Sequence, residues 1–233
     1  MEARDGTRGW SRREWLATSA VAAGALWLGR TAPAFAKGVP DVVPDLTPAQ
    51  AWQRLLEGNQ RFAAGKSRAP HRSLDRVHEL ADHQNPFAAI LSCSDSRVPV
   101  ELVFDQGFGD LFVVRNAGNV AAPQEFASLE YGVGVLGAKV LLVLGHSSCG
   151  AVKAAISGKP VPGQISVLYQ HIRPAVDAGG SDVAKVVSAN VRVQADLLKQ
   201  SSTVIAELVN DGKLQVAGGV YDLATGVVTP VAV

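Results

Sequence analysis

The stretch that decides the fold is Lys139-Val-Leu-Leu-Val-Leu-Gly145, which His146-Ser-Ser-Cys149 follows directly. Residues 140–144 are apolar on both faces of an extended chain, which is typical of a strand in the middle of a parallel sheet. Apolar runs at 87–91 and 111–115 predict two further buried strands. The three runs together indicate a mostly parallel sheet.

Helical patterns alternate with these strands. Thr47 is placed to be an N-cap with Pro48 at the first helical position, and apolar spacing up to Phe62 predicts an amphipathic arm helix over 47–64. Further helical segments are expected at 73–82, at 123–136, from about 148, at 164–177 and at 182–210, and a final strand at 214–221. We therefore expect an α/β fold: a mostly parallel central β-sheet flanked by helices, with an N-terminal helical arm.

The composition sets broad limits on function. The chain has 233 residues, of which 47% are hydrophobic and 18% charged, and its formal net charge is +1. Because it contains no run of like charges, nothing indicates nucleic acid or an anionic membrane surface as a partner.

The first 36 residues have the pattern of a secretory signal. Ser11-Arg12-Arg13-Glu14 begins a charged segment, an apolar run covers 15–29, and Ala34-Phe35-Ala36 matches a cleavage site. The paired arginines indicate the Tat route, with export to the periplasm or the exterior. The alternative is an uncleaved membrane anchor. A membrane-spanning helix needs about 20 apolar residues, whereas this apolar run has only 15. We expect no stable membrane insertion after cleavage, and the chain divides into a signal peptide (1–36), a linker (37–46) and one domain (47–233).

Both cysteines of the chain lie in two short motifs, Cys93-Ser-Asp95-Ser-Arg97 and His146-Ser-Ser-Cys149. Each motif follows a predicted strand, and ligands of α/β sheets gather at the carboxyl ends of the strands. Two thiolates and one imidazole favour a single Zn²⁺ ion per chain. Three protein ligands leave a fourth position for water, which is the arrangement of a catalytic site.

Asp95 and Arg97 lie close enough to Cys93 to take part in this chemistry. Asp95 could fill the fourth position on the metal and close the site. Alternatively, it could pair with Arg97 and accept a hydrogen bond from the metal-bound water. The spacing leaves both arrangements open.

Gly132-Val-Gly134-Val-Leu-Gly137 matches the spacing of a dinucleotide-binding motif. Such a motif follows a strand and opens a helix, whereas this one ends a helical segment and precedes a strand. We interpret its small residues as sites of close helix packing.

The paired motifs resemble those of the β-class carbonic anhydrases, and the resemblance covers nearly all of residues 46–230. The segments 58–62, 109–119 and 219–226 are similar to that family as well. The resemblance implies reversible hydration of CO₂ to bicarbonate and a proton by zinc-bound hydroxide. It also implies Cys93, His146 and Cys149 as zinc ligands, with Asp95 and Arg97 as the catalytic pair.

Three more residues match positions that contact substrate in plant-like members of that family. Gln84 corresponds to a glutamine that hydrogen-bonds substrate, and Phe112 and Tyr131 correspond to aromatic residues of the CO₂ pocket, partly across a subunit boundary. The resemblance therefore implies a homodimer or a larger homo-oligomer.

One position departs from the pattern of some bacterial members. Those members have a regulatory bicarbonate site with a tryptophan three residues before the first zinc cysteine, where this chain has Ile90. We expect a site that is open at neutral pH and is not closed by bicarbonate.

Three other functions compete with CO₂ hydration. A CS₂ or COS hydrolase would keep the fold and the metal and change only the substrate. A non-catalytic zinc-binding homologue would lose the Asp95–Arg97 pair or fill the fourth position, and this chain keeps the pair. A two-cysteine redox protein would leave His146 and Asp95 without a role.

Overall fold

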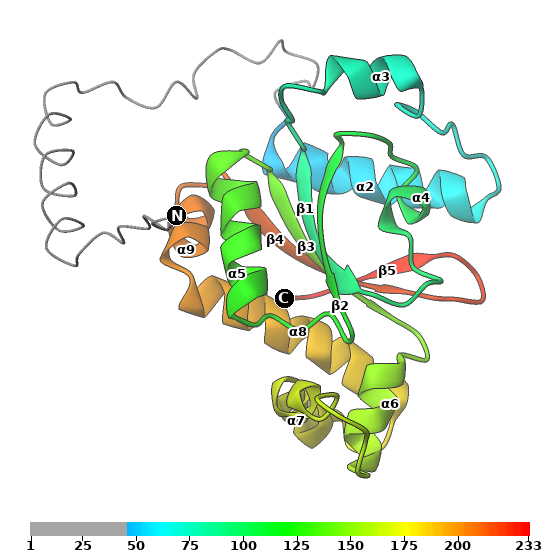
Figure 1. Ribbon diagram of the computed structural model, residues 1–233, viewed down its shortest axis with the longest axis vertical. Helices are drawn as coiled ribbons and strands as arrows, with labels where there is room; N and C mark the ends of the chain where they lie inside the picture. The colour runs from blue at the N-terminus through cyan, green and yellow to red at the C-terminus, as the bar shows by residue number, and fades with distance from the viewer. Residues whose placement is uncertain (1–45) are drawn as a thin grey trace, which may run out of the picture. The chain divides into compact units, whose positions relative to one another are not determined.

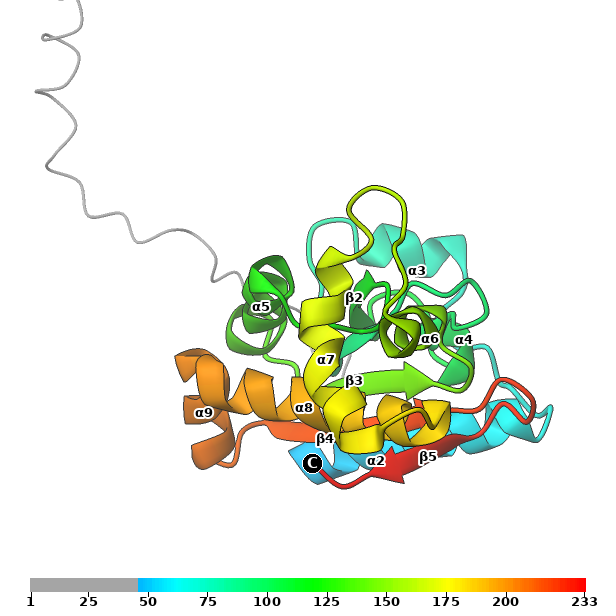
Figure 2. The same cartoon turned by 90° about the horizontal axis from the view of Figure 1, so that it is seen from below.

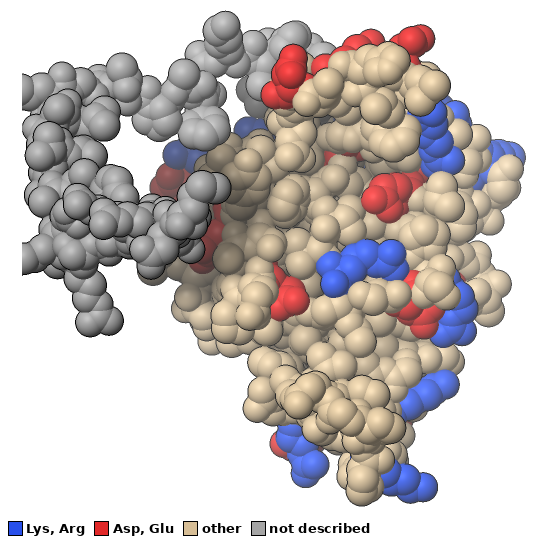
Figure 3. Space-filling model, in the orientation of Figure 1, with Lys and Arg blue, Asp and Glu red and all other residues tan. Residues whose placement is uncertain are grey.

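Residues 46–233 are described by a computed structural model. The predicted signal peptide (1–36) and almost all of the predicted linker (37–46) lie outside the described residues. Within 46–233, no helix is long and apolar enough to cross a membrane. On the face that Figure 3 shows, acidic and basic side chains are scattered over a largely uncharged surface.

A five-stranded sheet with the order β2-β1-β3-β4-β5 forms the centre of the described chain (Figure 1). The strands are β1 (Ala88–Cys93), β2 (Leu111–Asn116), β3 (Val140–His146), β4 (Gln215–Tyr221) and β5 (Val228–Val231). Strands β1 to β4 pair in parallel, which confirms the predicted sheet, and β5 pairs antiparallel with β4. Both β1 and β3 extend two residues beyond their predicted ends, so their last residues belong to the strands instead of following them.

Helices occupy the connections between the strands, as predicted. They are α2 (Pro48–Ala63), α3 (Leu74–Glu79), α4 (Val100–Val103), α5 (Pro123–Glu130) with the π-helix η1 (Tyr131–Val135), α6 (Gly150–Ser157), α7 (Val167–Gly179), α8 (Val183–Ser201) and α9 (Thr203–Asn210). Thr47 caps the arm helix α2, because its Oγ1 accepts the N–H of Gln50 and the Gln50 side chain accepts the N–H of Thr47. The predicted N-terminus of this helix is confirmed.

The helices cover both faces of the sheet. Leu55 of α2 packs with Ile90 and Leu142 on one face. On the other face, Leu91 packs in a cluster that includes Leu198 of α8. Figure 2 shows α7 beside α6 and α8, where these three helices enclose a third apolar cluster that contains both cysteines. The central strands are therefore buried on both faces, as their apolar sequences require.

The helical region predicted at 182–210 is broken at Ser202. The Ser202 backbone is extended, with φ −106° and ψ 116°, and its Oγ accepts the N–H of Ile205 at the start of α9. The same hydroxyl donates to Glu130 Oε1 at 2.6 Å. Serine satisfies the free N–H groups of a new helix in this way, which explains the change of helix direction.

The glycine-rich segment at the end of α5 is a packing surface, as the sequence predicts. A Cβ on Gly132 would lie 2.8 Å from Cδ1 of Phe112, and a Cβ on Gly134 would lie 2.9 Å from Cγ1 of Val204. The absent side chains let β2 and α9 approach η1 closely.

Candidate metal centre

Three predicted metal ligands meet at the carboxyl edge of the sheet. Cys93 ends β1, His146 ends β3, and Cys149 directly precedes α6. Because β1 and β3 are parallel neighbours with Ser92 opposite Leu144, their last residues reach the same edge. The two sulfur atoms and an imidazole nitrogen lie within 4.8 Å of one another, and all three residues are buried. This cluster fits a metal site.

The turn that joins β3 to α6 is fixed by hydrogen bonds to the segment after β4. The Ser147 N–H donates to the carbonyl of Tyr221 at 2.8 Å, and the Leu223 N–H donates to Oγ of Ser147 at 2.9 Å. Ser148 has a φ of +59°, in the left-handed region, and the chain reverses there. The turn thereby places Cys149 close to the end of β3.

The imidazole of His146 presents a free nitrogen to the cluster. Its Nδ1 lies 2.9 Å from the carbonyl of Ser147, so Nδ1 carries the proton and donates it. Nε2 is buried and has no hydrogen-bond partner among residues 46–233, and it lies 3.9 Å from Oδ2 of Asp95. A buried nitrogen lone pair without a donor is unfavourable unless it binds a metal. The orphaned Nε2 is therefore direct support for a metal at this position.

A hydrogen bond links the two cysteine side chains of the cluster. The thiol of Cys149 donates to Sγ of Cys93 and lowers the pKa of Cys93, and the backbone N–H groups of Gly118 and Asp95 act in the same direction. The pKa of Cys149 is raised, because this hydrogen bond and burial both favour its thiol form. Metal binding therefore has to release protons from this site.

Gly118 contacts the metal-binding sulfur directly, a role that the sequence did not reveal. Its N–H lies 3.3 Å from Sγ of Cys93. The Gly118 φ is +86°, and a Cβ there would lie 3.0 Å from Cδ1 of Ile172 and 3.1 Å from Cβ of Ala151. Only glycine combines this backbone conformation with so close an approach.

Asp95 is paired with Arg97 in this structure. Nε of Arg97 donates to Oδ1 at 2.9 Å, Nη2 donates to Oδ2 at 2.7 Å, and the Arg97 N–H also reaches Oδ1 at 3.0 Å. These hydrogen bonds, led by the guanidinium, hold the pKa of Asp95 well below its usual range. The carboxylate is therefore ionised at neutral pH and acts only as a hydrogen-bond acceptor. Of the two predicted arrangements, the structure has the paired one.

Arg115 of β2 is a second residue that the sequence analysis missed. Its Nε donates to the carbonyl of Cys93 at 3.0 Å, and its Nη2 donates to the carbonyl of Asp95 at 2.8 Å. The guanidinium thus fixes the backbone that carries Cys93 and the Asp95 carboxylate. The only sign of this role in the sequence was that Arg115 lies within residues 109–119, a segment that resembles the β-class carbonic anhydrases.

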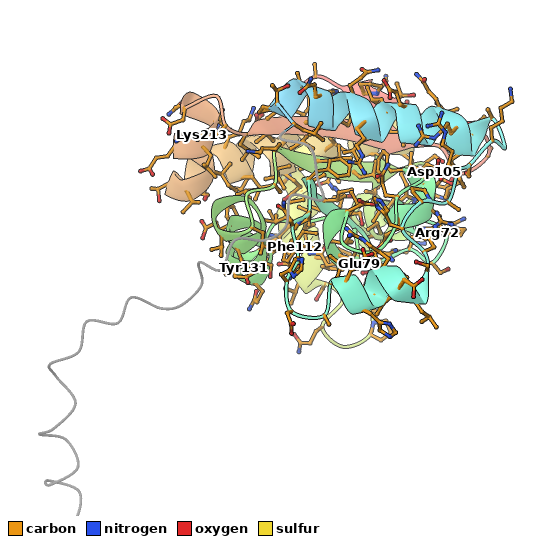
Figure 4. The ribbon with its side chains drawn as sticks, turned by 90° about the horizontal axis from the view of Figure 1, so that it is seen from above. Arg72, Glu79, Asp105, Phe112, Tyr131 and Lys213 are labelled. Carbon is orange, nitrogen blue, oxygen red and sulfur yellow. The ribbon has the colours of Figure 1, made fainter. Side chains whose placement is uncertain are left out.

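The three predicted substrate residues do not join the metal ligands within one chain. Phe112 of β2 pairs with Ala89 of β1, near the amino ends of the strands. Ala89 is four residues before Cys93, which places Phe112 roughly 13 Å from Cys93 along the strand direction. Tyr131 lies beside Phe112, with 6.1 Å between their ring centroids (Figure 4). Gln84 is exposed in the loop before β1, at this same amino edge. Within one chain, the predicted metal ligands therefore lie at the carboxyl ends of the strands, and the predicted substrate residues lie at the amino ends.

Comparisons with known proteins agree with this description. The model of the family described as carbonic anhydrase matches residues 88–228. A carbonic anhydrase 2 of Mycobacterium tuberculosis is 39% identical over 192 residues, which cover 79% of this chain and 93% of the relative. The solved structure of the β-carbonic anhydrase CcaA is 31% identical, covers 77% of this chain and 86% of its own, and has a TM-score of 0.61.

A second structural neighbour is one of two tetrameric β-carbonic anhydrases from Sordaria macrospora, with 25% identity and a TM-score of 0.64. The match covers 78% of this chain and 97% of the neighbour. Fold and site together define an α/β protein with a buried cluster of two cysteines and one histidine, which fits a metal ion, at the carboxyl edge of a mostly parallel sheet. The chain belongs to the carbonic anhydrase family, and its structural neighbours are of the β class.

Replacing Cys149 with alanine should abolish metal binding, because two ligands cannot hold the ion as three do. Metal content and chemical unfolding, each with and without a chelator, measure this. The wild type should lose stability on chelation, whereas Cys149→Ala should be less stable and insensitive to chelator.

Val152→Ala is the matched control, because Val152 is equally buried one turn further along α6 and offers no metal ligand. We expect it to cost about 2 kcal/mol of unfolding free energy while it keeps its metal and its response to chelator. A full equivalent of metal in Cys149→Ala would refute the ligand assignment.

Proposed function

We propose that this chain is a zinc enzyme that catalyses the reversible hydration of CO₂ to bicarbonate and a proton. Cys93, His146 and Cys149 would hold one Zn²⁺ ion per chain. The observation that carries the proposal is the orphaned Nε2 of His146, 3.9 Å from the Asp95 carboxylate, in a cluster whose two sulfurs and one imidazole nitrogen lie within 4.8 Å of one another. Family membership supports the same reaction.

The donor set supports zinc as the metal. Two sulfur atoms and one imidazole nitrogen are ligands that zinc prefers, and a fourth position stays free for solvent. When bound there, zinc supplies a Lewis acid that lowers the pKa of a coordinated water to about 7.

Asp95 orients the attacking water in this proposal. Its carboxylate lies beside the imidazole Nε2 and is held ionised by Arg97, so it can accept a hydrogen bond from the water. Accepting that bond aims an oxygen lone pair at the carbon of CO₂. Arg97 fixes the rotamer of the carboxylate through two parallel N–H···O bonds. Burial of the three ligands keeps bulk water away from the reacting atoms.

We place the substrate pocket between two copies of the chain. Gln84, Phe112 and Tyr131 lie at the amino edge of the sheet and the metal ligands at the carboxyl edge. A homodimer that brings the amino edge of one copy to the carboxyl edge of the other would complete each site. The tetrameric state of the neighbour from Sordaria macrospora supports a homo-oligomer.

We further propose that the site is open at neutral pH. The Asp95–Arg97 pair supports this, because a carboxylate whose two oxygens accept hydrogen bonds from Nε and Nη2 of the guanidinium is not free to bind the metal. Ile90, at the position where some bacterial members have the tryptophan of a regulatory bicarbonate site, is fully buried and packs with Leu55 and Leu142. We also propose export by the Tat route, on the sequence of residues 1–36.

Asp95→Asn should keep a full equivalent of zinc but lose hydration activity by about 100-fold or more, because an amide cannot replace the ionised acceptor. Stopped-flow CO₂ hydration and metal analysis on one sample measure this. Asp177→Asn is the matched control: it alters an exposed aspartate–arginine pair, 2.9 Å from Arg173 on α7. An unchanged rate in Asp95→Asn would remove Asp95 from the mechanism.

Mixed oligomers test the placement of the pocket. Gln84→Ala should lower the rate about tenfold through the loss of one hydrogen bond to substrate. When Gln84→Ala and Asp95→Asn chains are unfolded and refolded together, some sites regain both residues from different chains, and activity should exceed the sum of the two parents.

Refolding Gln84→Ala with Tyr131→Ala is the matched control, because both changes lie at the same edge and no mixed site is intact. If the refolded mixture of Gln84→Ala and Asp95→Asn chains is no more active than the sum of its two parent proteins, the whole pocket lies within one chain.

A further inference from the structure

Helix α8 carries two buried amide side chains on its packed face. Asn190 and Gln194 are 1% and 0% exposed and lie one helical turn apart. Nε2 of Gln194 donates to Oδ1 of Asn190 at 3.1 Å. A buried amide is unfavourable unless all of its donors and acceptors have partners, so the partners of this pair indicate what it does.

The pair holds the turn that follows β2. Nδ2 of Asn190 donates to the carbonyl of Gly118 at 2.9 Å, and the N–H of Ala121 donates to Oε1 of Gln194 at 2.8 Å. Nε2 of Gln194 also donates to the carbonyl of His171 on α7 at 3.0 Å. The turn is thus attached at two points to a long, well-packed helix.

Gly118, whose carbonyl Asn190 holds, also contacts the cluster. Its N–H lies 3.3 Å from Sγ of Cys93. Glycine has no side chain to limit its torsions, so the direction of its N–H depends on what holds the rest of the residue. The carbonyl is held by Asn190, the next two residues are held by Asn116, and Ala121 is held by Gln194.

We propose that Asn190 and Gln194 are positioning residues that keep the Gly118 N–H on the Cys93 sulfur and thereby tune the metal. This inference rests on the metal ion proposed above for Cys93, His146 and Cys149. A hydrogen bond to a ligating sulfur withdraws electron density from it, so the metal receives less and remains a stronger Lewis acid. Two thiolates make a zinc ion electron-rich, and the Gly118 N–H offsets part of that donation.

Asn59 provides a matched control for this role. It is also buried, at 3% exposure, and its amide bonds the carbonyls of Val103 and Gly226 and the N–H of Val228 at 2.7–3.1 Å. These bonds tie α2 to α4, to β5 and to the loop before β5, and they involve none of the proposed metal ligands. Asn59→Leu and Asn190→Leu are therefore the same substitution with comparable structural loss.

The absorption spectrum of the full-length protein loaded with cobalt(II) tests whether the hydrogen bond changes the electron density on the sulfur, and it does so without an activity assay. In Asn190→Leu, the thiolate-to-cobalt absorption band should move to longer wavelength, because the sulfur lone pairs rise in energy when their hydrogen bond is lost. The zinc enzyme should lose about tenfold in kcat or in metal affinity. Asn59→Leu should leave the band in place, and a band that also stays in place in Asn190→Leu would overturn the proposal.

A second measurement needs no variant. In cadmium-113-loaded wild type, scalar coupling through the N–H···S bond should link the Gly118 amide proton to the metal, beside the couplings from the β-protons of both cysteines. Couplings from both cysteines without one from Gly118 would overturn this inference and leave the metal assignment intact. Absence of the cysteine couplings would instead reject the metal site, and the inference with it.

Discussion

The parallel pairing of β1 with β3 is the constraint on which the site depends. Its register sets Ser92 opposite Leu144, so Cys93 and His146, which are 53 positions apart in the sequence, end neighbouring strands at one edge. A change of one residue in this pairing would turn one ligand to the other face of the sheet. Both strands are fully buried, and β3 is rich in branched apolar residues, so a shift of register would disturb the packing on both faces of the sheet.

The surroundings of each ligand then define its chemistry. The Ser147 carbonyl selects the imidazole tautomer, the Gly118 N–H reaches one sulfur, and Arg115 fixes the backbone between Cys93 and Asp95. Each contact comes from the backbone or from a rigid guanidinium, so the protein itself fixes the geometry of the site. Such preorganisation is what a metal site needs to hold an open position for substrate.

Much of this could be predicted from the sequence. The buried strands, the capped arm helix and the cysteine–histidine spacing follow from local patterns that one chain carries by itself. The four-residue β5 was missed, because it is short and contains Pro230, which an edge strand tolerates. Asn190 and Gln194 gave no signal, because a buried amide pair on a helix becomes informative only once its partners are known. The separation of Phe112 from the metal ligands depends on the strand register, which sequence spacing does not contain.

We propose that one metal ion, held by Cys93, His146 and Cys149, makes this chain a catalyst of CO₂ hydration. Stopped-flow hydration of CO₂ by the purified protein, with zinc determined on the same sample, tests it most directly. We expect fast hydration at one zinc per chain, loss of the rate on chelation and recovery on adding zinc back. A sample with full zinc and no hydration above the buffer rate would contradict the account.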